Sequence, residues 1–101
     1  SPMLHIVNKS PAQTTSLASC LRLAKDGQTL LLTEDGVLAA TAANAAGSGI
    51  AAATARLKVV VLQPDVAARG MAGKMAEGVS AVDYAGFVDL VAEHSTNQSW
   101  L

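Results

Sequence analysis

Four short apolar runs recur along the chain, and turn residues bound each of them. The runs are Met3–Val7, Thr29–Leu32, Lys58–Leu62 and Val79–Val82. The segments between them have helix-compatible compositions, and this alternation is typical of crossover units in which helices cover a parallel sheet. The sequence therefore predicts an α/β protein, a single three-layer domain with a mainly parallel sheet of about four to five strands.

The segment after the first run has the apolar spacing of an amphipathic helix. The residues at positions i, i+3, i+4 and i+7 of this stripe are Leu17, Cys20, Leu21 and Ala24. A stop signal follows at Asp26-Gly27, and candidate N-caps precede the stripe at Thr14, Thr15 and Ser16. Cys20 is therefore expected on the inner stripe of this helix or at its edge.

Later helices are predicted from composition and from start signals. Residues 38–55 are mostly alanine with a break at Gly47-Ser48-Gly49, which predicts a short helix, a loop and a second helix capped by Ser48. Their small side chains allow close backbone approach, either to the sheet or to another subunit. Pro64 favours a short helix after the third run. The last helix is predicted to begin after Asp83 as its N-cap, with a polar stretch after it.

The composition is unfavourable for an isolated monomer. Of the 101 residues, 50% are hydrophobic and 15% are charged. A domain of this length buries only about two-thirds of the surface that its unfolded chain exposes. We therefore expect an oligomer in which neighbouring subunits cover apolar patches. The net charge is −1 and no cluster of Lys and Arg is present, so direct nucleic-acid binding is not expected.

The location of the protein is inferred from features that the sequence lacks. The first apolar run begins almost at once, without the basic region and long apolar core of a secretory signal. The uncharged stretch 36–55 has the length of a membrane span, but it is mostly alanine and contains polar and glycine breaks. We therefore expect a cytoplasmic protein with no membrane segment. Ser1 and Pro2 precede Met3 and are interpreted as a cloning remnant.

Signatures of cofactor and metal sites are missing from the sequence. A phosphate-binding turn needs glycines after a strand, and residues 8–11 contain none, so no nucleotide or flavin is expected. His5 and His94 have no metal-ligand spacing with each other or with Cys20, so no metal is expected. We interpret His5 as a strand residue satisfied by backbone or a partner, and His94 as a solvated helix end.

Polar residues follow the first three apolar runs, at 8–11, 34–36 and 63–65. Ligands of open parallel sheets bind outside the carboxyl ends of the strands, so a site is expected there. Arg69 is predicted to pair with Asp65 one turn earlier or with an acidic residue of a partner.

A large aromatic residue near a chain end needs a neighbour to cover it, which suggests a docking contact for Trp100. The candidates for a partner interface are Asn8, Lys9, Asp35, Arg69 and Trp100.

Cys20 is the only cysteine, so it forms no disulfide within the chain. Free cysteine is among the most buried residue types, and the neighbours of Cys20 on its helical stripe are apolar. A reactive thiol needs a pKa lowered by a helix N-terminus or a nearby cation, whereas Cys20 lies more than a turn inside its helix. These residues favour a packing role and leave a sulfur nucleophile as the alternative.

Several sequence blocks, taken in order, resemble the DsrH/TusB family. They are Met3 to Pro11, Ser19-Cys20-Leu21-Arg22, Glu34-Asp35-Gly36-Val37, Pro64 to Gly70, Val82 to Val88, and Gln98-Ser99-Trp100-Leu101. The resemblance covers 3–101 and is poorest at 38–55. It implies the DsrE/F/H-like, flavodoxin-like architecture.

The resemblance implies an accessory subunit of a heterohexameric sulfurtransferase complex, a sulfur relay. Its implied partners are DsrE/TusD-like and DsrF/TusC-like subunits, which pass persulfide sulfur to a DsrC/TusE-type carrier. The pathway is either wobble 2-thiouridine formation in tRNA or dissimilatory sulfur oxidation. The Ser-Cys-Leu context of Cys20 resembles DsrH-like members and favours the oxidation branch. The essential persulfide cysteine is implied to reside on another subunit.

Two alternatives stay open. In the first, Cys20 is itself a persulfide carrier, which would make it a catalytic residue. In the second, the chain is a homo-oligomeric structural protein without a sulfur role.

Overall fold

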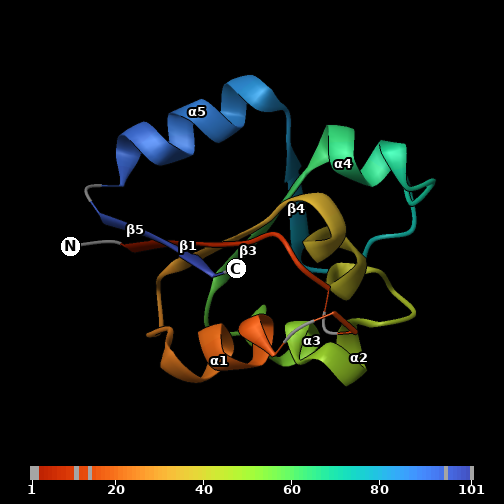
Figure 1. Cartoon of the computed structure of the whole chain (residues 1–101), viewed down its shortest axis with the longest axis horizontal. Coiled ribbons are helices and arrows are strands. Elements are labelled where there is room, and N and C mark those ends of the chain that lie inside the picture. The colour runs from red at the N-terminus through yellow and green to blue at the C-terminus, as the bar shows by residue number, and fades with distance from the viewer. Residues whose placement is uncertain (1–2, 11, 14, 95, 101) are drawn as a thin grey trace.

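The computed structural model of the chain describes residues 3–10, 12–13, 15–94 and 96–100. Within these residues, five strands form one parallel sheet in the order β4-β3-β2-β1-β5 (Figure 1). The strands are β1 (Met3–Val7), β2 (Thr29–Leu32), β3 (Lys58–Leu62), β4 (Val79–Val82) and β5 (Thr96–Trp100). The helices are α1 (Ser16–Leu23), the 3-10 helix η1 (Glu34–Ala40), α2 (Ala45–Ser48), α3 (Ile50–Ala53), α4 (Gln63–Ala68) and α5 (Tyr84–Glu93). The predicted α/β class is confirmed, and so are the bounds of β1 to β4.

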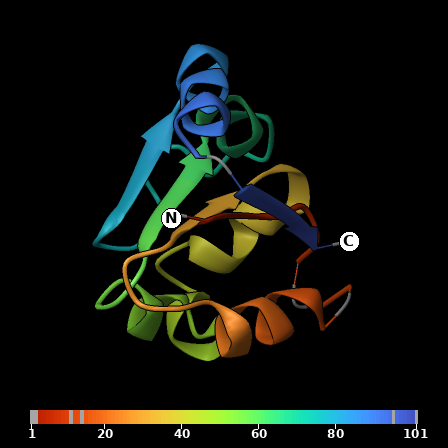
Figure 2. The ribbon, with the colours of Figure 1, turned by 90° about the vertical axis from the view of Figure 1, so that its left-hand side faces the viewer.

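Helices cover both faces of the sheet. α1, α2 and α3 lie along one face and α5 lies along the other (Figures 1 and 2). A larger apolar cluster joins β1, β2 and β3 to the helices of the first face. The smaller cluster consists of Leu4, Leu31, Val60 and Leu90, so it joins the same three strands to α5. Every residue of β2 is buried, because a parallel strand covered on both faces has no solvent side.

The path of the chain explains why α5 has its face to itself. From β1 to β4 the strands are added one after another in the same direction across the sheet. The chain then returns through α5 and places β5 beside β1, at the opposite edge (Figure 2). Parallel crossovers are right-handed, so a connection that runs in the reverse direction must lie on the opposite face. α5 therefore closes the second layer of the fold.

β5 is the element that the sequence did not predict as a strand. Its residues Thr96 to Ser99 are exposed, so they lack the alternation of apolar and polar positions that identifies a half-buried strand. Backbone pairing with β1, in a register that sets His5 opposite Gln98, makes this segment a strand. Its polar composition fits its position at the sheet edge.

Three other local predictions need correction and one is confirmed. α1 ends at Leu23, before the predicted Asp26-Gly27 stop. η1 begins at Glu34, ahead of the predicted helical segment 38–55, and extends to Ala40. Gly49, with a φ of 89°, is the N-cap of α3 in place of Ser48. The predicted N-cap of α5 is confirmed, since the Asp83 carboxylate accepts the backbone N–H of Gly86 at 2.8 Å.

Among the described residues, no helix has both the length and the apolar character that crossing a bilayer requires.

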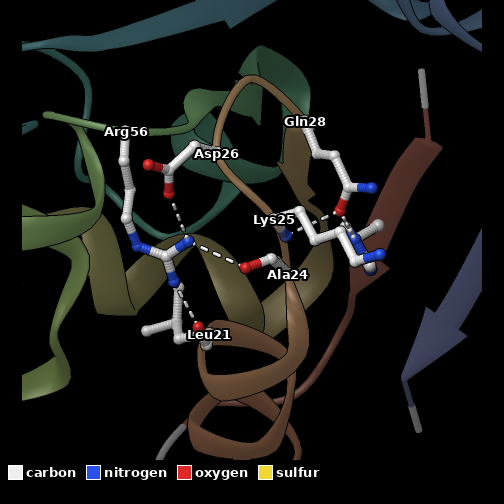
Figure 3. A network of polar contacts seen from close by, with 7 residues as sticks. Leu21, Ala24, Lys25, Asp26, Gln28 and Arg56 are labelled. Atoms are coloured by element: carbon white, nitrogen blue, oxygen red, sulfur yellow. Dashed lines mark hydrogen bonds and ion pairs between the residues drawn. The ribbon is translucent and has the colours of Figure 1, made fainter. Parts of the chain in front are cut away.

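Arg56 joins the C-terminal end of α1 to the loop before β3 (Figure 3). Its guanidinium donates hydrogen bonds to the carbonyl oxygens of Leu21 and Ala24, the latter at 2.8 Å, and contacts the Asp26 carboxylate at 3.3 Å. The last carbonyls of a helix have no partners within the helix, so Arg56 satisfies groups that would otherwise depend on water. This residue therefore fixes the end of the helix that carries Cys20.

We predict that Arg56→Met lowers the free energy of unfolding by about 1–3 kcal/mol, because two backbone carbonyls lose a charged donor. Urea unfolding followed by circular dichroism measures the change. Arg22→Met is the matched control, since Arg22 is an exposed arginine of α1, and its effect should be about 0.5 kcal/mol or less. Equal effects of the two substitutions would contradict a specific capping role for Arg56.

Candidate functional site

The carboxyl ends of β2 and β3 carry a cluster of charged residues. Arg69, after α4, donates from Nε to Asp35 Oδ1 of η1 at 2.8 Å. Its Nη1 donates to the carbonyl oxygen of Asp65 at 3.2 Å and lies 4.0 Å from the Asp65 carboxylate. Arg69 thus has two acidic neighbours within its own chain, and Asp35 is the closer one. The sequence had predicted Asp65 or a partner's acid, so Asp35 was missed as a partner, because its contact spans 34 positions.

The backbone of η1 is arranged so that Asp35 faces Arg69. Glu34 has a left-handed φ of 49°, a conformation that costs an ordinary residue roughly 1–3 kcal/mol. The N–H of Glu34 donates to Asp65 Oδ2 at 2.6 Å, which helps to hold this conformation. A Cβ on the buried Gly36 would overlap the Val7 carbonyl oxygen, so the start of η1 lies directly against the end of β1.

The charges around Asp35 lower the pKa of its carboxyl below the usual 3.8. The hydrogen bond from Arg69 is the main cause, with further contributions from the charge of Arg69, a hydrogen bond with Gln13 and the charge of Lys9. Lys9 therefore belongs to the electrostatic surroundings of Asp35. Asn8 lies next to it at the end of β1, and its buried Oδ1 has no hydrogen-bond partner within the described residues.

Two hollows adjoin Leu38. The first has a volume of about 360 Å³ and is lined by Ser10, Ala12, Leu38, Ala39, Ala43, Asn44, Gly47 and Ser48. The second has a volume of about 450 Å³ and is lined by Leu38, Thr41, Ala42, Ala43, Asn44, Met71 and Lys74. Sequence reasoning missed Met71 and Lys74. The alanine content of 38–55 was the available sequence signal for the hollows themselves, because small side chains leave room for another group.

Cys20 lies in the apolar cluster between α1 and the sheet and is fully buried. Burial raises the pKa of its thiol to about 12, although the charge of Arg56 acts in the lowering direction. A sulfur nucleophile needs an accessible thiol with a lowered pKa. The position of Cys20 has the opposite properties, and this favours the packing interpretation.

The remaining sequence candidates lie elsewhere. His5 is buried in β1 and contacts side chains, since its Nε2 lies 2.7 Å from Gln28 Oε1 and its Nδ1 lies 3.1 Å from Trp100 Nε1. Trp100 packs against the larger apolar cluster, so its own chain covers part of it. His94 is half-buried, with Nδ1 lying 2.7 Å from the Leu90 carbonyl oxygen. Within the described part of the chain, no three His, Cys, Asp or Glu residues converge as a metal site would require.

Residues 9–97 match the family described as DsrH like protein. This chain belongs to the DsrH family. The chain is similar to protein TusB of Escherichia coli O81 (strain ED1a). The two are 38% identical over 98 residues, which are 97% of this chain and 100% of that protein. TusB of Escherichia coli O6:K15:H31 (strain 536 / UPEC) has the same identity and coverage. The family resemblance of the sequence blocks is confirmed.

The crystal structure of the ychN protein from E. coli has the same fold as this DsrH-family chain. The two superpose with a TM-score of 0.81 over 98% of each chain, at 18% sequence identity. At this identity the likeness establishes the fold alone.

We predict that the pKa of Asp35, followed by NMR of the carboxyl carbon, lies below 3.8 in the native protein and rises in Arg69→Met. The reason is that the hydrogen-bonded guanidinium stabilises the carboxylate. Lys9→Met should give a smaller rise, because Lys9 contributes only its charge. Arg22→Met, a substitution on α1, should leave the value unchanged. An unchanged value in Arg69→Met would contradict the pairing.

We predict that Cys20 makes the protein less stable at high pH. The unfolded thiol ionises near its usual pKa of 9.0, whereas the native thiol keeps its proton up to about 12. The contribution of the neutral thiol is therefore fully present below pH 9 and is lost between these values, by at most about 1.4 kcal/mol per pH unit. Urea unfolding across this range should show a smaller loss of stability in Cys20→Ala.

Alkylation by iodoacetamide provides an independent readout of the same burial. At neutral pH the native thiol should react at least about 100-fold more slowly than in urea, because reaction requires opening of the core. Comparable rates in native and unfolded protein would overturn the buried assignment.

Proposed function

We propose that this chain is an accessory subunit of a multi-subunit sulfur-relay complex and does not itself carry the transferred sulfur. Family membership and the full-length identity to TusB support the relay assignment. The partners that we propose are DsrE/TusD-like and DsrF/TusC-like subunits, with a DsrC/TusE-type carrier receiving the sulfur. The proposed complex is a heterohexamer and acts in the cytoplasm.

The burial of the only cysteine is the observation that carries the accessory role. Sulfur relay proceeds when a thiolate attacks the outer sulfur of a persulfide, so donor and acceptor sulfurs must meet. Cys20 has no exposed surface, and with a pKa of about 12 only roughly one thiol in 10⁵ is ionised at neutral pH. A chain with this cysteine alone needs another subunit to supply the persulfide.

The surface offers features suited to subunit contacts. The ion-pair cluster of Asp35 and Arg69 lies at the carboxyl edge of the sheet, and the two hollows adjoin Leu38 on η1. Large apolar side chains are exposed on α1 and α5: Leu23, Tyr84 and Val88. Such patches are covered by partners in oligomeric proteins. We propose the five candidates from the sequence, Asn8, Lys9, Asp35, Arg69 and Trp100, as interface residues beside these exposed side chains.

We propose wobble 2-thiouridine formation in tRNA as the pathway, because the similarity to TusB extends over the whole chain. Dissimilatory sulfur oxidation is the second candidate. The observation that favours it is the Ser19-Cys20-Leu21 sequence, which resembles DsrH-like members.

Complementation tests the proposal directly. We expect this chain, expressed in an E. coli strain that lacks TusB, to restore 2-thiouridine in tRNA hydrolysates measured by mass spectrometry. Cys20→Ala should restore it equally, since Cys20 is assigned a packing role. Affinity purification of the tagged chain should recover the TusD-like and TusC-like subunits with both versions.

The outcomes separate the alternatives. Loss of thiolation in Cys20→Ala with the subunits still bound would identify Cys20 as a persulfide carrier. A folded chain that binds no companion subunits and forms one species with itself in native mass spectrometry would favour the structural homo-oligomer. Binding of the subunits without thiolation would contradict the tRNA pathway and leave sulfur oxidation as the remaining candidate.

A further inference from the structure

Three side chains form a polar chain across the edge of the sheet. His5 lies in the middle, with Gln28 on one side and Trp100 on the other, at 2.7 and 3.1 Å from its two ring nitrogens. The rings of His5 and Trp100 lie 6.1 Å apart and are tilted by 37°. His5 is buried, with a relative exposure of 3%. The relay function proposed above assigns no role to this group of side chains.

Both neighbours determine which nitrogen of His5 carries the proton. The indole N–H of Trp100 only donates, so Nδ1 of His5 must accept. The backbone N–H of Lys25 donates to Gln28 Oε1 at 2.9 Å, which fixes that oxygen as an acceptor (Figure 3). Nε2 of His5 therefore carries the proton and donates it to Gln28. These two partners therefore select a single tautomer of the His5 ring.

β5 depends on Trp100 for its side-chain anchoring. The other four residues of the strand are exposed, whereas Trp100 packs against the apolar cluster and bonds to His5. β5 is also an edge strand, so backbone bonds hold it only to β1. Strands with few buried contacts open at low free-energy cost. The hydrogen bond between His5 and Trp100 therefore joins the last strand to the core.

We propose that protonation of His5 releases Trp100 and loosens β5, so that the C-terminal strand is an acid-sensitive latch. Both nitrogens of an imidazolium are donors. On protonation, the new Nδ1–H would point at the indole N–H, and two donors at 3.1 Å repel each other. The bond to Gln28 survives, because Nε2 donates in both states. The opposition is therefore confined to the Trp100 side of the network.

Few charged groups surround His5 to counter this effect. On α1 the titratable side chains are Cys20, which is buried, and Arg22, which is exposed. In the loop that follows, Lys25 and Asp26 are exposed, and Asp26 contacts Arg56. The described residues of β2 and β5 carry no charged side chain. Of these described groups, Asp26 is the only anion, so the surroundings provide little compensation for an imidazolium.

Trp100 is the only tryptophan, so its fluorescence reports the latch without interference. On acidification from about pH 8 to about pH 5, emission should shift to longer wavelength as the indole meets water. Hydrogen exchange followed by mass spectrometry, corrected for intrinsic rates, should accelerate in β5 by up to about tenfold per pH unit. Exchange in β2 should not change with it.

Three variants decide the origin of the response. His5→Gln should abolish the spectral shift and the acceleration, because no titrating group then faces Trp100. Trp100→Phe keeps a ring but removes the opposing N–H, so the acid-dependent acceleration should be smaller than in the wild-type chain. This second variant leaves the buried His5 in place. His94→Gln is the matched control and should respond like the wild-type chain.

The proposal is overturned if the wild-type chain shows no response over this range, or if His5→Gln retains it. Loss of the response in His94→Gln would likewise overturn it, by assigning the effect to α5.

Discussion

The burial of β1, β2 and β3 on both faces is the constraint on which the other features depend. These strands consist largely of Leu and Val, and the sheet can remain in water only if helices cover each face. α1, α2 and α3 cover one face, and Leu90 of α5 packs on Leu4, Leu31 and Val60 of the other, so this second face would stay open without α5. The return of α5 across the sheet also fixes the position of β5, since the chain emerges beside β1.

The same arrangement explains why the inner side of α1 is apolar whereas the carboxyl edge of the sheet is charged. α1 must bury its apolar stripe to cover the first face, and this places Cys20 where a thiolate is strongly disfavoured. Polar side chains are displaced to the carboxyl edge, where β2 and β3 end side by side. Asp35, Asp65 and Arg69 meet there because parallel neighbours end at the same edge.

The proposed role follows from this division between core and edge. A subunit whose cysteine serves the core contributes contacts to a relay, and the sulfur chemistry is supplied by a companion. The strained start of η1 and the ion pair of Arg69 form a preorganised edge that a partner can meet without reordering it. At the other end of the chain, the His5 and Trp100 pair links an exposed edge strand to the same core.

The sequence by itself determined the fold class, the bounds of the first four strands, the amphipathic first helix with Cys20 on its inner stripe, and the DsrH family. These features are encoded locally, in apolar periodicity, capping residues and ordered motifs. Only the tertiary structure decided that Asp35 is the closer partner of Arg69, that Trp100 bonds to His5, and that residues 96–100 form a strand. Each of these depends on atoms 34 or 95 positions apart, or on pairing with β1, and local patterns carry no signal of such contacts.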